Sequence, residues 1–114
     1  MEIQVNVDCA DLDTMVRFYT AALGYEPYGR AGDHYASIVH PTLPKLVFQK
    51  VPEPRIGKNR VHLDLIVGDA IEAEAERFVG LGAQRLSDGV VSEYGVSWIV
   101  MADPEGNEIC LCDG

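Results

Sequence analysis

Residues 60–67 read R-V-H-L-D-L-I-V, an alternating run that is typical of a β-strand. Successive side chains of a strand point to opposite faces, so Val61, Leu63 and Leu65 share one face and His62 and Asp64 the other. A strand face that carries an imidazole and a carboxylate is either half exposed or lines a polar cavity. Whether this face is exposed to solvent or lines a cavity is therefore the main functional question for the chain.

The same pattern occurs at the N-terminus, where apolar and polar residues alternate as Ile3, Gln4, Val5, Asn6, Val7 and Asp8. Seven residues separate Gln4 from Asp11, and seven separate His62 from Asp69. A Leu-Gly pair ends thirteen residues after each aspartate, so these landmarks recur at an offset of 58 residues. Recurring landmarks in a small chain predict two copies of one structural unit.

Each copy reads β-α-β-β-β. Asp11 is expected to cap the first helix, which Gly24 ends, and Asp69 with Glu72 predicts a capping-box start for the second helix. The predicted strands cover residues 2–8, 25–29, 35–40 and 46–51 in the first copy and 60–67, 84–87, 96–101 and 108–112 in the second, with a loop over 88–95. The predicted class is α+β, a single domain over 1–114 with module 1 at 1–51, a linker at 52–59 and module 2 at 60–114.

Composition narrows the function classes. The 114 residues are 47% hydrophobic, which fits one globular domain, and no apolar run approaches the ~20 residues of a membrane span. A net charge of −9 argues against nucleic acid as a partner and favours a cationic ligand, although solubility also accounts for it. Three cysteines give no disulfide framework and no secretory signal is visible, so a cytoplasmic location is expected.

Pairing the two halves would let both sheets curve round a shared cavity, in a pseudo-two-fold arrangement with the helices outside. Polar side chains on the inner strand faces need partners, and a ligand pocket with a few convergent polar groups supplies them. The predicted ligand-binding residues are polar strand residues, candidate aromatic walls and one cysteine of the last strand. They are Gln4, Asn6, Phe48, His62, Asp64, Trp98 and Cys110.

The chain resembles the vicinal oxygen chelate superfamily, which includes glyoxalase I, bleomycin-resistance proteins and extradiol dioxygenases. The resemblance covers essentially the whole chain. It rests on the doubled β-α-β-β-β order, on the residues Asp11-Leu12, Phe18-Tyr19 and Leu23-Gly24-Tyr25, on Val61-His62-Leu63-Asp64-Leu65, and on the Asp103-Pro104-Glu105-Gly106-Asn107 turn.

The resemblance implies a candidate divalent metal, Zn, Ni, Mn or Fe, with one ligand from the first and one from the last strand of each half. By position these are Gln4, His62, Cys110 where the family usually has Glu, and either Phe48 or Gln49. Hard ions prefer anionic oxygen, whereas a Cys110 thiolate would suit Zn²⁺. Asp64 either substitutes as a ligand or orients the imidazole.

Two functions follow from the resemblance. One is a binding protein of the bleomycin-resistance kind, which sequesters a small, cationic or aromatic compound. The alternative is a metal-dependent glyoxalase-type lyase or isomerase. A partner-binding module with a vestigial pocket is the third option, and superfamily members often form homodimers.

Overall fold

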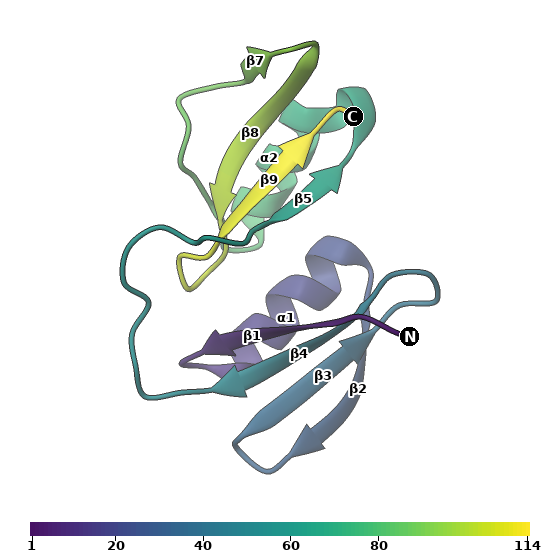
Figure 1. Ribbon diagram of the computed structural model, residues 1–114, viewed down its shortest axis with the longest axis vertical. Coiled ribbons are helices and arrows are strands. Elements are labelled where there is room, and N and C mark those ends of the chain that lie inside the picture. The colour runs from purple at the N-terminus through teal and green to yellow at the C-terminus, as the bar shows by residue number, and fades with distance from the viewer. The chain divides into compact units, whose positions relative to one another are not determined.

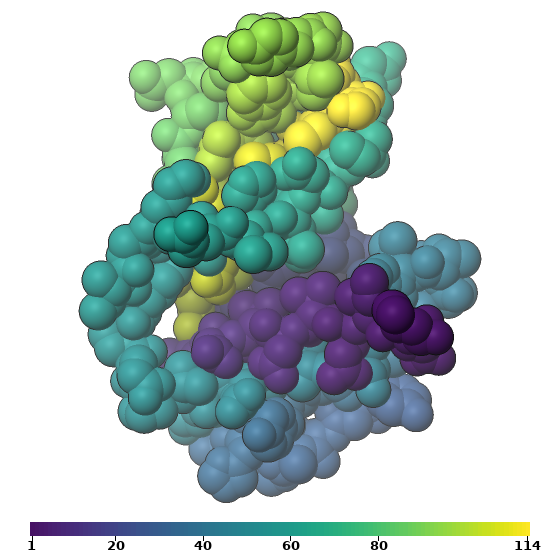
Figure 2. Space-filling model, in the orientation of Figure 1, coloured from purple at the N-terminus to yellow at the C-terminus, as the bar shows by residue number.

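The computed structural model describes all residues, 1–114, as two compact units, Met1–Pro54 and Arg55–Gly114. The boundary between them falls inside the segment predicted as a linker. In Figure 2 the purple N-terminal strand lies on the viewed surface of the first unit. No helix in either unit has the length and apolar character needed to cross a membrane.

The first unit is a four-stranded sheet with one helix. Its elements are β1 (Gln4–Cys9), α1 (Leu12–Leu23), β2 (Glu26–Ala31), β3 (Tyr35–Val39) and β4 (Lys45–Lys50). The strand order is β1-β4-β3-β2, with β1 parallel to β4 and the other pairs antiparallel. Helix α1 covers one face of this sheet (Figure 1).

The second unit repeats this plan with one additional strand. Its elements are β5 (Leu63–Ile66), the 3₁₀ turn η1 (Gly68–Ala70), α2 (Ile71–Gly80), β6 (Gln84–Arg85), β7 (Val91–Glu93), β8 (Val96–Ala102) and β9 (Glu108–Cys112). The order is β5-β9-β8-β6, with β5 parallel to β9 and β7 also paired with β8. The α+β class and the repeated β-α-β-β-β order are therefore confirmed.

Each unit has its own core between its helix and one face of its sheet. In the first unit, Phe48 and Ile38 are fully buried, and the Phe48 ring stacks on Tyr19 of α1 at 5.4 Å between centroids. In the second unit, the fully buried side chains of β8 and β9 pack toward α2, which contributes Phe78. Burying one face in this way leaves the other face of each sheet without a helix, and we call it the helix-free face.

The two helices start differently. Asp11 caps α1 as predicted, since its carboxylate accepts a hydrogen bond from the Thr14 amide at 3.0 Å, and Gly24 ends the helix with a left-handed φ of 72°. Asp69 does not cap α2. It lies in η1, and the position before Ile71 is Ala70, which has no side-chain cap. The predicted capping box is thus wrong, because a 3₁₀ turn intervenes between β5 and the helix.

Two strand predictions also need correction. The strand predicted over residues 60–67 begins only at Leu63, and Val61 is 84% exposed, so an apolar residue of the connecting segment was assigned to the strand face. The loop predicted over 88–95 contains β7. Its hairpin turns at Tyr94 and Gly95, which both have positive φ, of 53° and 78°.

Candidate functional site

The helix-free face of the second sheet brings together an imidazole, a carboxylate and a thiol. β5 and β9 are parallel neighbours, and their register sets Asp64 directly opposite Cys110. His62 lies two residues before Asp64, just ahead of the strand. The possible ligand atoms of His62, Asp64 and Cys110 all lie within 4.8 Å of one another, and we call these residues the His62–Asp64–Cys110 cluster.

His62 and Asp64 are in contact. Nδ1 of His62 lies 3.2 Å from Oδ1 of Asp64, and 37% of the imidazole and 55% of the carboxylate side chain are exposed. Cys110 is different, because only 7% of it is exposed. The cluster therefore has two solvent-accessible groups above a buried thiol.

Burial and neighbouring negative charge suppress ionisation of the thiol. Burial, followed by the charges of Asp64, Cys112 and Glu108, raises the pKa of Cys110 to about 11. Burial and Asp64 also raise the pKa of Cys112. Without a cation nearby, both cysteines are protonated at neutral pH, and a protonated thiol is a poor nucleophile. The chemistry of this cluster thus depends on a positive charge.

A divalent metal ion would provide that charge, and the residues fit one. Zn²⁺ is bound by imidazole nitrogen, thiolate sulfur and carboxylate oxygen, and three protein ligands leave a fourth position open for a small molecule. A coordinating thiol loses its proton outright, because the metal charge outweighs its environment. Mg²⁺ and Ca²⁺ favour sets made only of oxygen, so this donor set favours Zn²⁺ over them.

The predicted site residues of the first unit lie on its helix-free face, with one exception. Gln4, Asn6 and Gln49 belong to the polar faces of β1 and β4, where Asn6 pairs with Val47 and Gln49 with Asp8. Phe48 lies on the opposite face, and its fully buried ring is in the core against Tyr19. No face of that ring is left for a ligand, so Gln49, and not Phe48, shares the face of Gln4.

Trp98 is half-buried on the helix-free face of the second sheet, where its register partners are Cys112 and Val91. It is therefore on the same face as the His62–Asp64–Cys110 cluster, one row of the sheet away. Cys112, the register partner of Trp98, lies in the same row as Trp98, and sequence reasoning did not select it as a site residue. The alternation of E-I-C-L-C in β9 was a sufficient signal, since it sets Glu108, Cys110 and Cys112 on one face.

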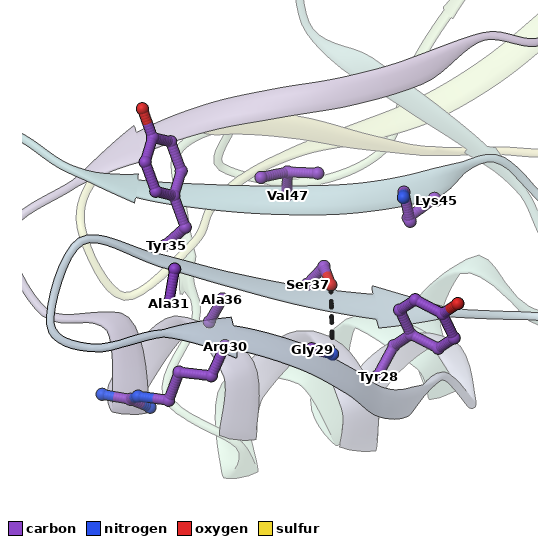
Figure 3. Close-up of a pocket in the computed structure, with 9 residues that line it drawn as sticks. All are labelled: Tyr28, Gly29, Arg30, Ala31, Tyr35, Ala36, Ser37, Lys45 and Val47. Atoms are coloured by element: carbon purple, nitrogen blue, oxygen red, sulfur yellow. Dashed lines mark hydrogen bonds between the residues drawn. The ribbon is translucent and has the colours of Figure 1, made fainter.

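The first unit carries a groove that sequence reasoning did not identify. It has a volume of about 320 Å³, and residues of β2, β3 and β4 line it (Figure 3). We call it the first-unit groove and describe it by Tyr28, Gly29, Tyr35, Ser37, Lys45 and Val47. The alternation in β4 indicates the face of Lys45 and Val47. Tyr28 could not be placed in this way, because β2 contains a bulge between Pro27 and Gly29.

Solved structures share this fold over nearly the whole chain. A glyoxalase/bleomycin resistance protein/dioxygenase family enzyme from Burkholderia phytofirmans PsJN is 18% identical with a TM-score of 0.82, and the match covers 96% of this chain and 94% of that one. The fosfomycin resistance protein FosX from Mesorhizobium loti is 14% identical with a TM-score of 0.78, over 100% and 92% of the two chains.

A third similar structure contains a metal. It is a variant of the FosX protein from Listeria monocytogenes in complex with Mn(II) and 1S,2S-dihydroxypropylphosphonic acid, 12% identical with a TM-score of 0.81 over 97% of this chain and 87% of that one. A search of curated proteins finds no match. The model of the glyoxalase-like domain matches residues 4–112. This chain therefore belongs to the glyoxalase-like domain family, within the vicinal oxygen chelate superfamily.

Proposed function

We propose that this protein binds a small oxygen-bearing molecule through a divalent metal ion held by His62, Asp64 and Cys110, and that it is a glyoxalase-type lyase or isomerase. The observation that carries the proposal is the convergence of three metal-ligating groups within 4.8 Å on a helix-free sheet face. The similar FosX structure with Mn(II) supports a metal in this superfamily. When bound, the metal would polarise a carbonyl or enediolate oxygen.

The residues of the cluster have separable roles in this proposal. His62 supplies a neutral nitrogen ligand, and the contact between its Nδ1 and Asp64 orients the ring, as carboxylates commonly do for metal-bound histidines. Cys110 anchors the ion from the buried side and gives up its proton on binding. Asp64 also supplies negative charge on the exposed side, either as a third ligand or through His62.

The metal content of purified variants tests the proposal. The wild-type protein, stripped with a chelator and reloaded, is expected to bind one Zn²⁺ per chain and to prefer it to Mn²⁺, measured by elemental analysis and competition with a chromophoric chelator. His62→Ala and Cys110→Ala should lose at least about 100-fold in Zn²⁺ affinity, because each removes a direct ligand of the ion.

Cys112→Ala is the matched control. Cys112 is a buried cysteine of the same strand, two residues away and outside the cluster. It should keep Zn²⁺ affinity within about threefold of the wild type, given the usual spread of mutational effects. Unchanged metal binding in both His62→Ala and Cys110→Ala, or an equal loss in Cys112→Ala, would contradict the assignment.

Metal-free sequestration of a cationic compound is the second candidate. The net charge of −9 favours it, as do exposed carboxylates on helix-free faces, Asp8 in the first unit and Asp64 in the second. In this case a cationic aromatic amine at 100 times its Kd should stabilise the chelator-treated protein by about 2.7 kcal/mol in a thermal-shift experiment. Stabilisation that requires Zn²⁺ would instead favour the metal-dependent function.

A further inference from the structure

The first-unit groove contains a cation that no acidic group neutralises. Lys45 is half-buried, and its Nζ lies 5.6 Å from the centre of the Tyr28 ring, a cation–π geometry. It forms none of the ion pairs of the chain. By contrast, Arg30 pairs with Asp13 at 2.7 Å and Lys50 with Asp33 at 2.9 Å. In a chain of net charge −9, an unpaired lysine in a groove favours an anionic ligand.

Arg30 does not compete for that ligand. Although it borders the groove, its guanidinium turns away toward the helix side of the sheet, where it bonds Asp13 (Figure 3). The positive charge within the groove is therefore localised on Lys45, at the end of the groove that Tyr28 occupies.

The rest of the groove suits a flat apolar body. Tyr28 and Tyr35 stand toward opposite ends, and they are 71% and 42% exposed, so both rings have free surface (Figure 3). Val47 lies between them on the sheet. Beside it is the Ser37 hydroxyl, which can donate or accept a hydrogen bond and already accepts one from the Gly29 amide at 3.2 Å. Exposed aromatic rings beside an aliphatic floor are typical of sites for planar ligands.

The bulge in β2 builds this arrangement. The register shift between Pro27 and Gly29 leaves Tyr28 as the extra residue, and this turns its ring to the groove. Gly29 leaves the floor of the groove free of a side chain at this position, since a Cβ there would come within 3.2 Å of Ser37 Oγ. The site is thus specified by local backbone geometry as well as by side-chain identity.

We propose that the first-unit groove binds a planar aromatic carboxylate, with the carboxylate at Lys45 and the ring over Val47 between Tyr28 and Tyr35. This inference goes beyond the proposed function, because it assigns a second small-molecule site on the first unit. It places no requirement on the His62–Asp64–Cys110 cluster, whose three residues belong to the other unit.

Three probes of similar size and different charge test it: benzoate, benzamide and benzylamine, titrated into the full chain and followed by NMR chemical-shift perturbation. Benzoate should bind with a Kd on the order of 1 mM and at least about tenfold more tightly than benzamide. Lys45→Met should remove this difference. Tyr28→Ala should weaken both ligands, and Tyr28→Phe should restore their binding, because the ring is retained.

Lys50→Met is the matched control. It removes a lysine from the same strand that already has a partner, and it should leave the preference for benzoate unchanged. Equal binding of benzoate and benzamide, tightest binding of benzylamine, or no saturable binding by any probe would overturn the proposal. So would a preference for benzoate that survives in Lys45→Met.

The two proposals fail separately. Lys45→Met should bind Zn²⁺ like the wild type, and His62→Ala should still prefer benzoate to benzamide. A wild-type protein that binds Zn²⁺ but shows no preference for benzoate over benzamide would overturn only the groove assignment. The absence of Zn²⁺ binding with an intact benzoate preference would overturn only the metal-dependent function.

Discussion

At the scale of single residues, Cys110 combines burial with a negatively charged neighbourhood. Both effects penalise the thiolate, and together they raise its pKa to about 11 from an ordinary value of 9.0. The same environment that keeps the thiol inert would attract a cation, because Asp64 and Glu108 supply negative charge next to it. A metal and a proton thus compete for one sulfur.

This shift predicts a loss of stability at alkaline pH in the metal-free protein. The unfolded thiol loses its proton near pH 9, whereas the folded thiol keeps it until about pH 11, so the folded state binds more protons in this window. The free energy of unfolding should fall across it, by at most about 2.7 kcal/mol. Urea unfolding of wild type and Cys110→Ala in chelator, from pH 8 to 11, measures the difference.

Other groups with raised pKa values, such as Tyr25, titrate in both proteins, and their contribution cancels in the comparison. Cys110→Ala should therefore lose less stability than the wild type above pH 9. Parallel pH profiles of the two proteins would show that the thiol is not held in its neutral form by the fold.

At the scale of elements, the two helices follow equivalent strands but begin in different ways. The sequence predicts an aspartate cap for both, because Asp11 and Asp69 occupy the same place in the repeat. Only Asp11 has the extended backbone of a cap residue, with φ −132° and ψ 104°. At Asp69 the chain is already in a 3₁₀ turn, a local conformation that a matching residue type cannot reveal.

Removing each aspartate should separate these roles. Asp11→Ala should lower Tm by roughly 3–6 °C, because it leaves the Thr14 amide without its side-chain acceptor. Asp69→Ala should shift Tm by less than about 2 °C, because the Asp69 side chain is exposed and makes no capping hydrogen bond. Differential scanning calorimetry at pH 7 compares the two variants, and equal losses would mean that Asp69 does cap α2 in solution.

The stability that the Asp11 cap contributes should also depend on pH. The hydrogen bond from the Thr14 amide lowers the pKa of the Asp11 carboxyl, so the cap contributes above the ordinary value of 3.8 and is lost as pH falls through the lowered value. The Tm difference between the wild type and Asp11→Ala should accordingly narrow in strong acid.

At the scale of the whole molecule, the repeat is what could be predicted most completely. The period-2 alternation and the helix ends are local signals, and they recur at a fixed offset, so the order of strands and helices followed directly. The His62–Asp64 pair was also local. Its proximity to Cys110 required the register of β5 on β9, which the superfamily resemblance implied but the residues themselves did not.

What could not be predicted depends on backbone detail. The first-unit groove needs the bulge that turns Tyr28, and β7 needs a turn in which Tyr94, a non-glycine residue, adopts positive φ. Neither has a distinctive residue pattern. Phe48 was misassigned because a shift of one residue along β4 exchanges the two faces of the sheet.

The segment between the units gives the last prediction. None of residues 52–62 makes a backbone–backbone hydrogen bond, and Ile56 within it is 87% exposed. Exposed chain without such bonds is the preferred site of proteolysis. Trypsin should therefore cut first after Arg55, Lys58 or Arg60, giving two fragments that each contain one unit, as mass spectrometry of early time points would show. A variant with glutamine at all three positions should survive longer, whereas Arg17→Gln with Arg77→Gln, which removes sites inside α1 and α2, should not. A first cut within either helix would show that the units open more readily than the segment that joins them.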